Sequence, residues 1–154
     1  MYKFILYIFL FFAGDANSHG TIEGVKSTIL GAVDPLRRCG GLATQRQLRI
    51  SGCDGYCRFT PGQIYNCEND FMPSQAIPQL NLRVEICLSG DICMTIINYE
   101  MPNSSVQPGF LYTAKYSFVP NDILSGRTVE FRASLLHSND LHVEVCVAAD
   151  VDVL

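Results

Sequence analysis

The side chains that could carry catalysis are scattered along this sequence. The three histidines fall in an N-terminal stretch (His19), a turn (His137) and a solvent-facing strand position (His142). No serine lies in a nucleophile-elbow motif, and no His-Glu-x-x-His segment is present. Because nucleophilic catalysis needs a nucleophile, a base and an orienting group within reach of one another, the sequence predicts a protein that is not an enzyme and uses no cofactor.

Metal binding is disfavoured by the spacing of the possible ligands. Cys53 and Cys57 are separated by three residues, but no second cysteine pair follows at zinc-finger spacing. Asp150 and Asp152 share one face of a strand-like segment, where paired carboxylates are usually just solvated. We therefore expect no metal site.

The first 18 residues have the pattern of a secretory signal peptide. Lys3 supplies a positive start, Phe4 to Ala13 are mostly apolar, and Ala16-Asn17-Ser18 offers a small-x-small cleavage site. The apolar run is short for a membrane span, and an uncleaved anchor is the alternative. All seven cysteines lie beyond this segment, so an exported chain would carry most of them as disulfides.

The mature surface is expected to be mildly acidic and glycosylated. The net charge of −4 is unchanged when Lys3 and Asp15 are removed, because their charges cancel. Without a basic run, the chain is a poor candidate for binding nucleic acid. Asn103-Ser104-Ser105 is an N-glycosylation sequon in a polar, proline-flanked stretch, so Asn103 is the predicted glycosylation site.

The stretch from Gln79 to Asn98 predicts a β-hairpin with one apolar face. Apolar residues recur at every second position, which is the period of a half-buried strand; they are Leu80, Leu82, Val84, Ile86 and Leu88, then Ile92, Met94 and Ile96. Ser89-Gly90-Asp91 forms the turn and sets Leu88 opposite Ile92. Cys87 then lies opposite Cys93, close enough for a disulfide.

Five more strand-like segments and an N-terminal tail complete the predicted organisation. Strand-like alternation recurs in Gln47 to Cys53, Ile64 to Phe71, Tyr112 to Phe118, Thr128 to Leu136 and Leu141 to Val153, with turns between them. Residues 19–33 contain Gly24 and Gly31 and are expected to form a poorly ordered tail, or a short amphipathic turn. The sequence therefore predicts one all-β domain over residues 34–154, an immunoglobulin-like two-sheet β-sandwich of about seven strands.

The alternation of apolar and polar residues does not decide whether the interior of the sandwich is packed or holds a cavity. Inward aliphatic and aromatic residues ordinarily form a packed core. The same pattern fits two sheets that separate around an apolar cavity.

The cysteines and strand motifs together resemble the ML family of secreted lipid-recognition domains, which includes the Niemann–Pick type C sterol carrier and the mite group-two allergens. The resemblance covers about Asp34 to Val153 and rests on the order of several short motifs. They are Asp34-Pro35-Leu36-Arg37-Arg38-Cys39-Gly40, Ile50-Ser51-Gly52-Cys53 with Cys57, Pro61-Gly62-Gln63-Ile64-Tyr65 with Phe71, Pro108-Gly109, Tyr116-Ser117-Phe118, Val129-Glu130-Phe131, and Cys146 with Val151-Asp152-Val153.

This resemblance implies two more disulfides. It pairs Cys39 with Cys146 and Cys53 with Cys57. The sterol carriers of the family have another cysteine pair before the Tyr-x-Tyr strand, whereas Met101 to Pro108 contains no cysteine here. Cys67 is left over and is expected to be a small buried thiol, with a redox or intermolecular role as the alternative.

The resemblance also implies a lipid site between the sheets. Carried over to this chain, the cavity walls are Tyr65, Phe71, Leu80, Leu82, Val84, Ile86, Leu88, Ile92, Met94, Ile96, Tyr116, Phe118, Val129, Phe131, Leu135 and Val145. Pro120, Ile123 and Leu124 are the candidates for the mouth. A carrier of this kind predicts an enclosed cavity of at least ~300 Å³.

The predicted function is that of a secreted, monomeric carrier of a sterol or another lipid, with the lysosome as an alternative place of action. A membrane or a receptor protein would receive the cargo. Two other functions stay open: a lipid-sensing co-receptor of innate immunity, and an immunoglobulin-like interaction module with a solid core and no ligand.

Overall fold

Ten β-strands and one short 3₁₀ helix make up the part of the chain that the computed structural model describes, residues 29–88 and 92–154. The strands are β1 (Leu30–Ala32), β2 (Arg37–Gly40), β3 (Thr44–Ser51), β4 (Cys57–Phe59), β5 (Tyr65–Met72), β6 (Leu80–Leu88), β7 (Ile92–Glu100), β8 (Tyr112–Phe118), β9 (Arg127–His137) and β10 (Val143–Val153), and the helix is η1 (Asp122–Leu124). Over these ranges, no helix is long and apolar enough to cross a membrane. The predicted signal peptide lies outside the described residues.

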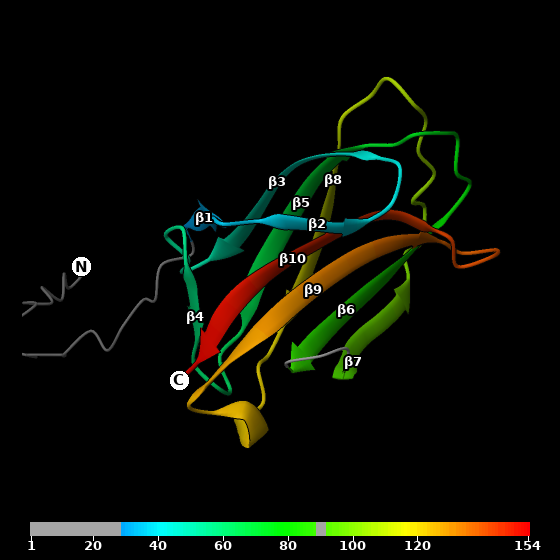
Figure 1. Cartoon of the computed structure of the whole chain (residues 1–154). Coiled ribbons are helices and arrows are strands. Elements are labelled where there is room, and N and C mark those ends of the chain that lie inside the picture. Colours follow the sequence, from blue (N-terminus) through cyan, green and yellow to red (C-terminus); the bar gives the residue numbers. More distant parts are fainter. Residues whose placement is uncertain (1–28, 89–91) are drawn as a thin grey trace, which may run out of the picture.

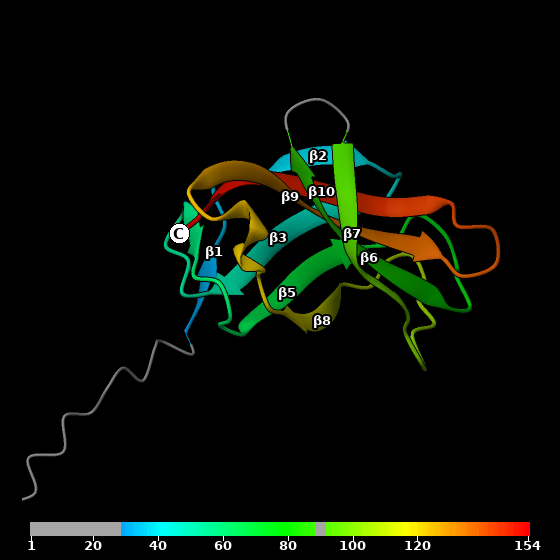
Figure 2. The ribbon, with the colours of Figure 1, turned by 90° about the horizontal axis from the view of Figure 1, so that it is seen from below.

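The strands form two facing sheets, as the sequence predicts. One sheet has the order β1-β3-β5-β8, and the other has the order β2-β10-β9-β6-β7 with β4 paired to β10. Figure 2 shows β3, β5 and β8 in one layer, with β9, β10 and β7 in the layer above it. The expected seven strands are too few because β1, β2 and β4 are only three or four residues long. Such short strands contain too little alternation to be recognised.

The folded domain begins earlier than predicted. Leu30–Ala32 forms β1 and pairs with β3, so the expectation of a poorly ordered tail is wrong for these residues. Gly31 permits this pairing, since a Cβ at that position would lie 1.7 Å from the carbonyl oxygen of Cys53. Residues 19–28 of the predicted tail lie outside the described residues.

The β6–β7 hairpin has the predicted register at its tip and a different one further along. Leu88 pairs with Ile92 and Cys87 with Cys93, as expected. A register shift between Val84 and Glu85 then inserts one extra residue on β7, so that Ile97 rather than Ile96 lies opposite Val84. Such a β-bulge reverses the alternation of the strand that contains it.

Aromatic rings join the two sheets at one end of the interior. Phe59 lies 4.7 Å from Tyr65, and Phe118 lies 5.1 Å from Phe131, measured between ring centroids. Both contacts cross from one sheet to the other, since Tyr65 and Phe118 belong to β5 and β8, whereas Phe59 and Phe131 belong to β4 and β9. Contacts of this geometry add specific attraction to the burial of apolar surface.

All three predicted disulfides are present. They link Cys39 with Cys146, Cys53 with Cys57, and Cys87 with Cys93. Cys67 is a buried free thiol on β5, as expected. The Cys39–Cys146 bridge has a sequence separation of 107 and joins β2 to β10. Figure 1 shows these two strands side by side.

Candidate functional site

An apolar pocket of about 60 Å³ opens at the end of the sandwich that carries η1. Its lining comes from both sheets and from the segment that follows β8; the residues are Phe59, Ile86, Met94, Ile96, Phe118, Val119, Pro120, Asn121, Ile123, Leu124 and Val153. Ile86, Met94, Ile96 and Phe118 belong to the predicted wall, and Pro120, Ile123 and Leu124 are the predicted mouth residues. The lining can hold an apolar group but offers no charged side chain.

The segment between β8 and β9 shapes the mouth of this pocket. Pro120 follows the last residues of β8, and Asn121 caps η1 by accepting a hydrogen bond from the Ile123 backbone N–H at 2.8 Å. The single helical turn buries Leu124 and leaves Ile123 exposed. A short polar cap therefore places two aliphatic side chains at the opening, one inside and one outside.

The pocket continues into an open groove of about 380 Å³ between β7 and β8. Ile64, Ile97 and Ser117 line the groove, together with Ile96, Phe118 and Val119, which also line the pocket. Both β7 and β8 are the last strands of their sheets, so no strand pairing closes the sandwich between them. The apolar interior is thus continuous with an apolar surface along this side.

Large apolar side chains surround the opening and face solvent. Ile64, Val119 and Ile123, each of which lines the pocket or the groove, are between 53% and 70% exposed. Exposed apolar residues are unremarkable singly, but a group of them around an apolar opening marks a surface used for binding. We call these three residues the rim.

Most of the predicted wall is a packed core. Eleven of its members are buried in one cluster, and two of them, Ile86 and Phe118, also line the pocket; the eleven are Tyr65, Phe71, Leu80, Leu82, Val84, Ile86, Phe118, Val129, Phe131, Leu135 and Val145. Leu88 and Tyr116 are half-buried, whereas Ile92 is exposed and lines neither the pocket nor the groove, so the structure does not place it in a cavity wall. The apolar cavity between the sheets is therefore smaller than the ~300 Å³ expected of an enclosed lipid site, because packed side chains fill the interior.

Polar side chains lie on the inner face of the four-stranded sheet, which the sequence reasoning missed. Asn69 is 1% exposed, and its Oδ1 accepts a hydrogen bond from Gln45 Nε2 at 2.7 Å. The Oε1 of Gln45 is buried without a hydrogen-bond partner, and the buried Tyr116 hydroxyl has only the Cys67 thiol beside it. Asn69 could have been found, because it continues the inward series that Tyr65, Cys67 and Phe71 define.

Cys67 and Tyr116 are paired across β5 and β8, and both remain protonated at neutral pH. Burial raises the pKa of the Cys67 thiol far above its ordinary value, and the nearby Tyr116 hydroxyl only partly offsets this. Burial likewise raises the pKa of Tyr116, and the neighbouring Cys67 raises it further. A thiol that stays protonated is a poor nucleophile, so Cys67 is a neutral part of the interior.

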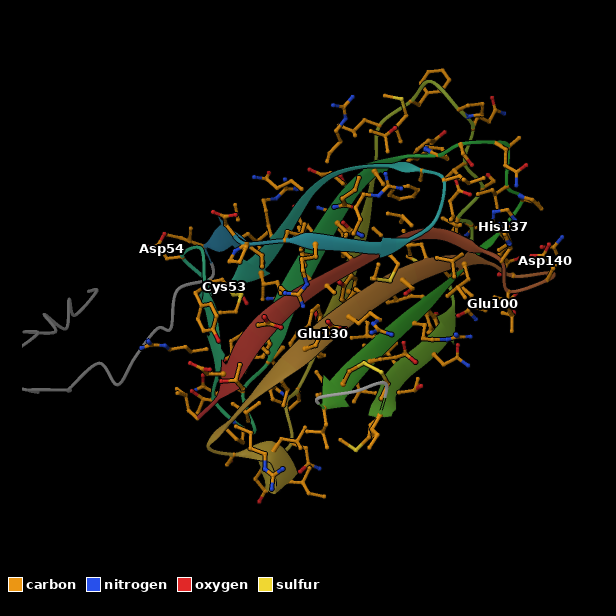
Figure 3. All side chains as sticks on the ribbon, viewed as in Figure 1. Cys53, Asp54, Glu100, Glu130, His137 and Asp140 are labelled. Atoms are coloured by element: carbon orange, nitrogen blue, oxygen red, sulfur yellow. A yellow bond between two sulfur atoms is a disulfide. The ribbon has the colours of Figure 1, made fainter. Side chains whose placement is uncertain are left out.

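A second group of polar residues lies at the opposite end, around the β9–β10 turn. His137 Nε2 lies 3.0 Å from Glu144 Oε2, and both side chains are almost fully buried. Glu144 also accepts a hydrogen bond from the Ser74 backbone N–H. Asp140 lies 3.8 Å from His137 Nδ1 on the exposed side, and Figure 3 labels both residues at this end of the sandwich. His142 contacts the His137 ring edge-on.

In this second group, the Glu144 carboxylate joins two other segments of the chain. Each oxygen of Glu144 faces a hydrogen-bonding group from another segment, His137 on β9 and Ser74 in the β5–β6 connection. Among the described residues, no group of three or more histidine, cysteine or acidic side chains could hold a metal ion. The sequence reasoning treated His137 as a turn residue and missed this pair, because its members meet only after β9 and β10 are aligned.

Asn103 lies in an exposed turn with a positive φ of 54°. Asparagine tolerates this conformation better than most residues do. An oligosaccharide attached at Asn103 would extend into solvent, and its presence stays a prediction.

The comparisons with known proteins agree with this architecture. The chain is similar to the structure of a Niemann-Pick type C2 protein from the Japanese carpenter ant, with 15% identity and a TM-score of 0.66 over 77% of this chain and 98% of that chain. It is also similar to the C-terminal domain of wzt, with 21% identity and a TM-score of 0.56 over 86% of each chain. No family model matches the sequence, and the comparison with curated proteins finds no relative. At these identities the likeness concerns the fold alone: the chain has an ML-like β-sandwich fold.

Proposed function

We propose that this protein binds a lipid between its two sheets and carries it through an aqueous compartment. The observation that carries the proposal is the continuous apolar path from the pocket beside Phe118 to the groove between β7 and β8. An ML-like fold supports it, because the similar carpenter-ant structure is a Niemann-Pick type C2 protein. Transfer of apolar surface from water, at about 25 cal/mol per Å², supplies the binding free energy without any catalytic group.

Ligand uptake would require the pocket to enlarge. A volume of about 60 Å³ holds only a small part of a lipid chain. The sheets can separate most easily where β7 and β8 face each other, since no strand pairing joins those two edges. The ligand would then displace van der Waals contacts such as that between Phe118 and Phe131, and no hydrogen bond of either sheet would need to break.

The rim provides a route for transfer. Ile64, Val119 and Ile123 would contact a membrane or an apolar receptor surface and keep the lipid out of water while it leaves the pocket. We expect export through the signal peptide, a monomer in solution, and a sterol as the leading ligand. Met94, with its flexible thioether, would let the wall fit lipids of different shape.

The packed interior favours one competing function. A sandwich with a solid core and exposed apolar residues also fits an interaction module that binds another protein through the rim. The two functions differ in whether the space between the sheets ever holds a ligand.

Native mass spectrometry of the secreted protein, with extraction of anything bound, tests the proposal. A co-purifying lipid, or uptake of a fluorescent sterol or fatty acid, is the expected result. Met94→Glu places a carboxylate at the pocket wall and should lower lipid affinity at least ten-fold. Tyr99→Glu is the matched control, because Tyr99 is exposed on the same strand and lines neither the pocket nor the groove. An empty protein that takes up neither probe would instead support the interaction module.

A further inference from the structure

The inward series of β9 begins with a charged residue. Every second residue from Val129 to Leu135 is apolar, buried and turned toward the interior. Arg127 occupies the preceding position of the same alternation, so its side chain starts on the same face of the strand. The residue between them faces the other way, since the Thr128 hydroxyl donates a hydrogen bond to Asp152 at 2.7 Å. A guanidinium therefore stands at the open end of an apolar series.

The strand register places Arg127 beside the pocket. Arg127 is paired with Val153 of β10, and Val153 lines the pocket. Directly opposed residues of an antiparallel pair share a face, with their Cβ atoms about 5 Å apart. The Gly126 N–H donates to the Val153 carbonyl at 2.7 Å, which fixes the start of β9 at this position. Because Arg127 is exposed, its long side chain can extend past Val153 to the opening of the pocket.

Arg127 differs from other arginines of the same sheet in having no partner. Arg37, Arg58 and Arg132 each form an ion pair with an acidic side chain. Within the ranges that the structure describes, Arg127 forms neither an ion pair nor a hydrogen bond with a side chain. Asp122 in η1 carries the opposing charge of the mouth segment, but its side chain is short and does not line the pocket. The positive charge of Arg127 is thus available to a ligand.

We propose that Arg127 binds an anionic group at the polar end of the lipid, an inference that rests on the proposed lipid-binding function. The pocket lining carries no charged side chain, so the apolar body of a lipid would enter and its polar end would stay at the mouth. A carboxylate or a sulfate there accepts charge-assisted hydrogen bonds from a guanidinium, which are stronger than those that a hydroxyl accepts. The inference concerns the polar end alone and applies to a sterol as well as to a fatty acid.

Asn121 would not make this distinction. Among the described residues that line the pocket, Asn121 is the one with a polar side chain. Its Oδ1 accepts the Ile123 N–H, which leaves the Nδ2 amide as the group that faces a ligand. A neutral amide donates to a hydroxyl and to a carboxylate alike. Selection between the two therefore depends on Arg127.

Binding of two matched lipid pairs at neutral pH tests this inference. One pair is dodecanoic acid and dodecan-1-ol, and the other is cholesterol sulfate and cholesterol; in each, only the polar end differs. We expect the natural protein to bind the anionic member about five-fold more tightly at low salt, the upper range for an exposed ion pair. Sodium chloride at about 0.5 M should reduce this preference, because salt screens exposed charges. Arg127→Gln should abolish the preference and leave affinity for the neutral members unchanged.

Arg46→Gln is the matched control, since it removes the same charge. Arg46 is exposed on β3, next to Gln45, which pairs with Phe71 at the end of β5 remote from the pocket. This variant should keep the preference, and so should Arg127→Lys, which retains the charge. Equal or weaker binding of the anionic members, or an unchanged preference in Arg127→Gln, would overturn the inference and leave the proposed function standing. Failure of all four lipids to bind would overturn the proposed function and the inference with it.

Discussion

The two ends of this sandwich are held together by different forces. At the end that carries η1, the sheets meet through aromatic and aliphatic side chains, and the edges of β7 and β8 are unpaired with each other. At the end that carries the β9–β10 turn, the His137–Glu144 pair is buried and Glu144 also binds the Ser74 backbone. The Cys39–Cys146 bridge lies in the same half and fixes β2 against β10.

This difference indicates which end can open. Van der Waals contacts between rings can re-form against a ligand, so separating them around a lipid costs little once the lipid is in place. A buried carboxylate cannot be separated from its partners so cheaply, because it would be left as an unpaired charge. We therefore call the end with the β9–β10 turn the fixed end and the end with η1 the adaptable end.

Removal of the Cys39–Cys146 bridge should have the largest effect on stability. The bridge closes a loop with a sequence separation of 107, whereas Cys87–Cys93 at the other end spans only 6. Chain-entropy arguments give about 4–5 kcal/mol for the long loop and about 2 kcal/mol for the short one. Denaturant titration of Cys39→Ser/Cys146→Ser should thus show the greater loss in the free energy of unfolding.

Cys87→Ser/Cys93→Ser is the control for that measurement. Its smaller loss would place the main covalent restraint in the fixed half. Equal losses in the two double variants would contradict the contrast between the ends.

Glu144→Ala comes next in size. It leaves His137 and the Ser74 N–H buried without their acceptor, and removing one partner of a buried pair costs about 3 kcal/mol or more. Asp140→Ala is the matched control, since Asp140 is exposed and lies 3.8 Å from the other nitrogen of the same histidine. An exposed partner of that kind contributes about 0–1 kcal/mol. Similar losses for the two variants would show that the buried contact is not special.

The same carboxylate predicts a pH dependence of stability. Burial pushes the pKa of Glu144 upward, but the hydrogen bonds from His137 and Ser74 outweigh it and hold the pKa below the ordinary value of 4.5. The stabilisation is therefore complete above pH 4.5 and is lost as the pH falls through the lower, folded-state pKa. Urea titrations across this range should show a steeper loss in the natural protein than in Glu144→Gln, and parallel curves would contradict this role of Glu144.

The adaptable end was more accessible to sequence reasoning than the fixed end. Strict alternation located the inward residues of β6 and the tip of the hairpin, because a period of two identifies the faces of a strand directly. It missed the change of register at Ile96 and Ile97, since a β-bulge adds a residue without any change in composition, although Ile96 still lines the pocket. The mouth candidates Pro120, Ile123 and Leu124 do line the pocket, and their part in lipid entry stays a prediction.

The fixed end depends on contacts that local pattern does not encode. His137 and Glu144 are seven positions apart, and they meet only because the β9–β10 register shifts between Val143 and Val145. Asn69 lies in the inward series of β5, but a polar side chain at one position of that series gives no sign that it is buried. β1 was hidden by its length of three residues and by Gly31, which ordinarily weakens regular structure.

Asn121→Ala should have the smallest effect on stability and a selective effect on the pocket. The substitution removes the side chain that accepts the Ile123 N–H, so η1 loses its cap at a cost of about 0.5 kcal/mol. The loss should be confined to the mouth, since Leu124 is the buried residue of η1 and Ile123 faces solvent. Hydrogen exchange should accelerate at Ile123 and Ser125 and stay unchanged in β9 and β10. Asn139→Ala, an exposed position in the β9–β10 turn, serves as the control. If Asn121→Ala instead accelerated exchange throughout β10, the two ends would open together and the fixed end would not be an independent restraint.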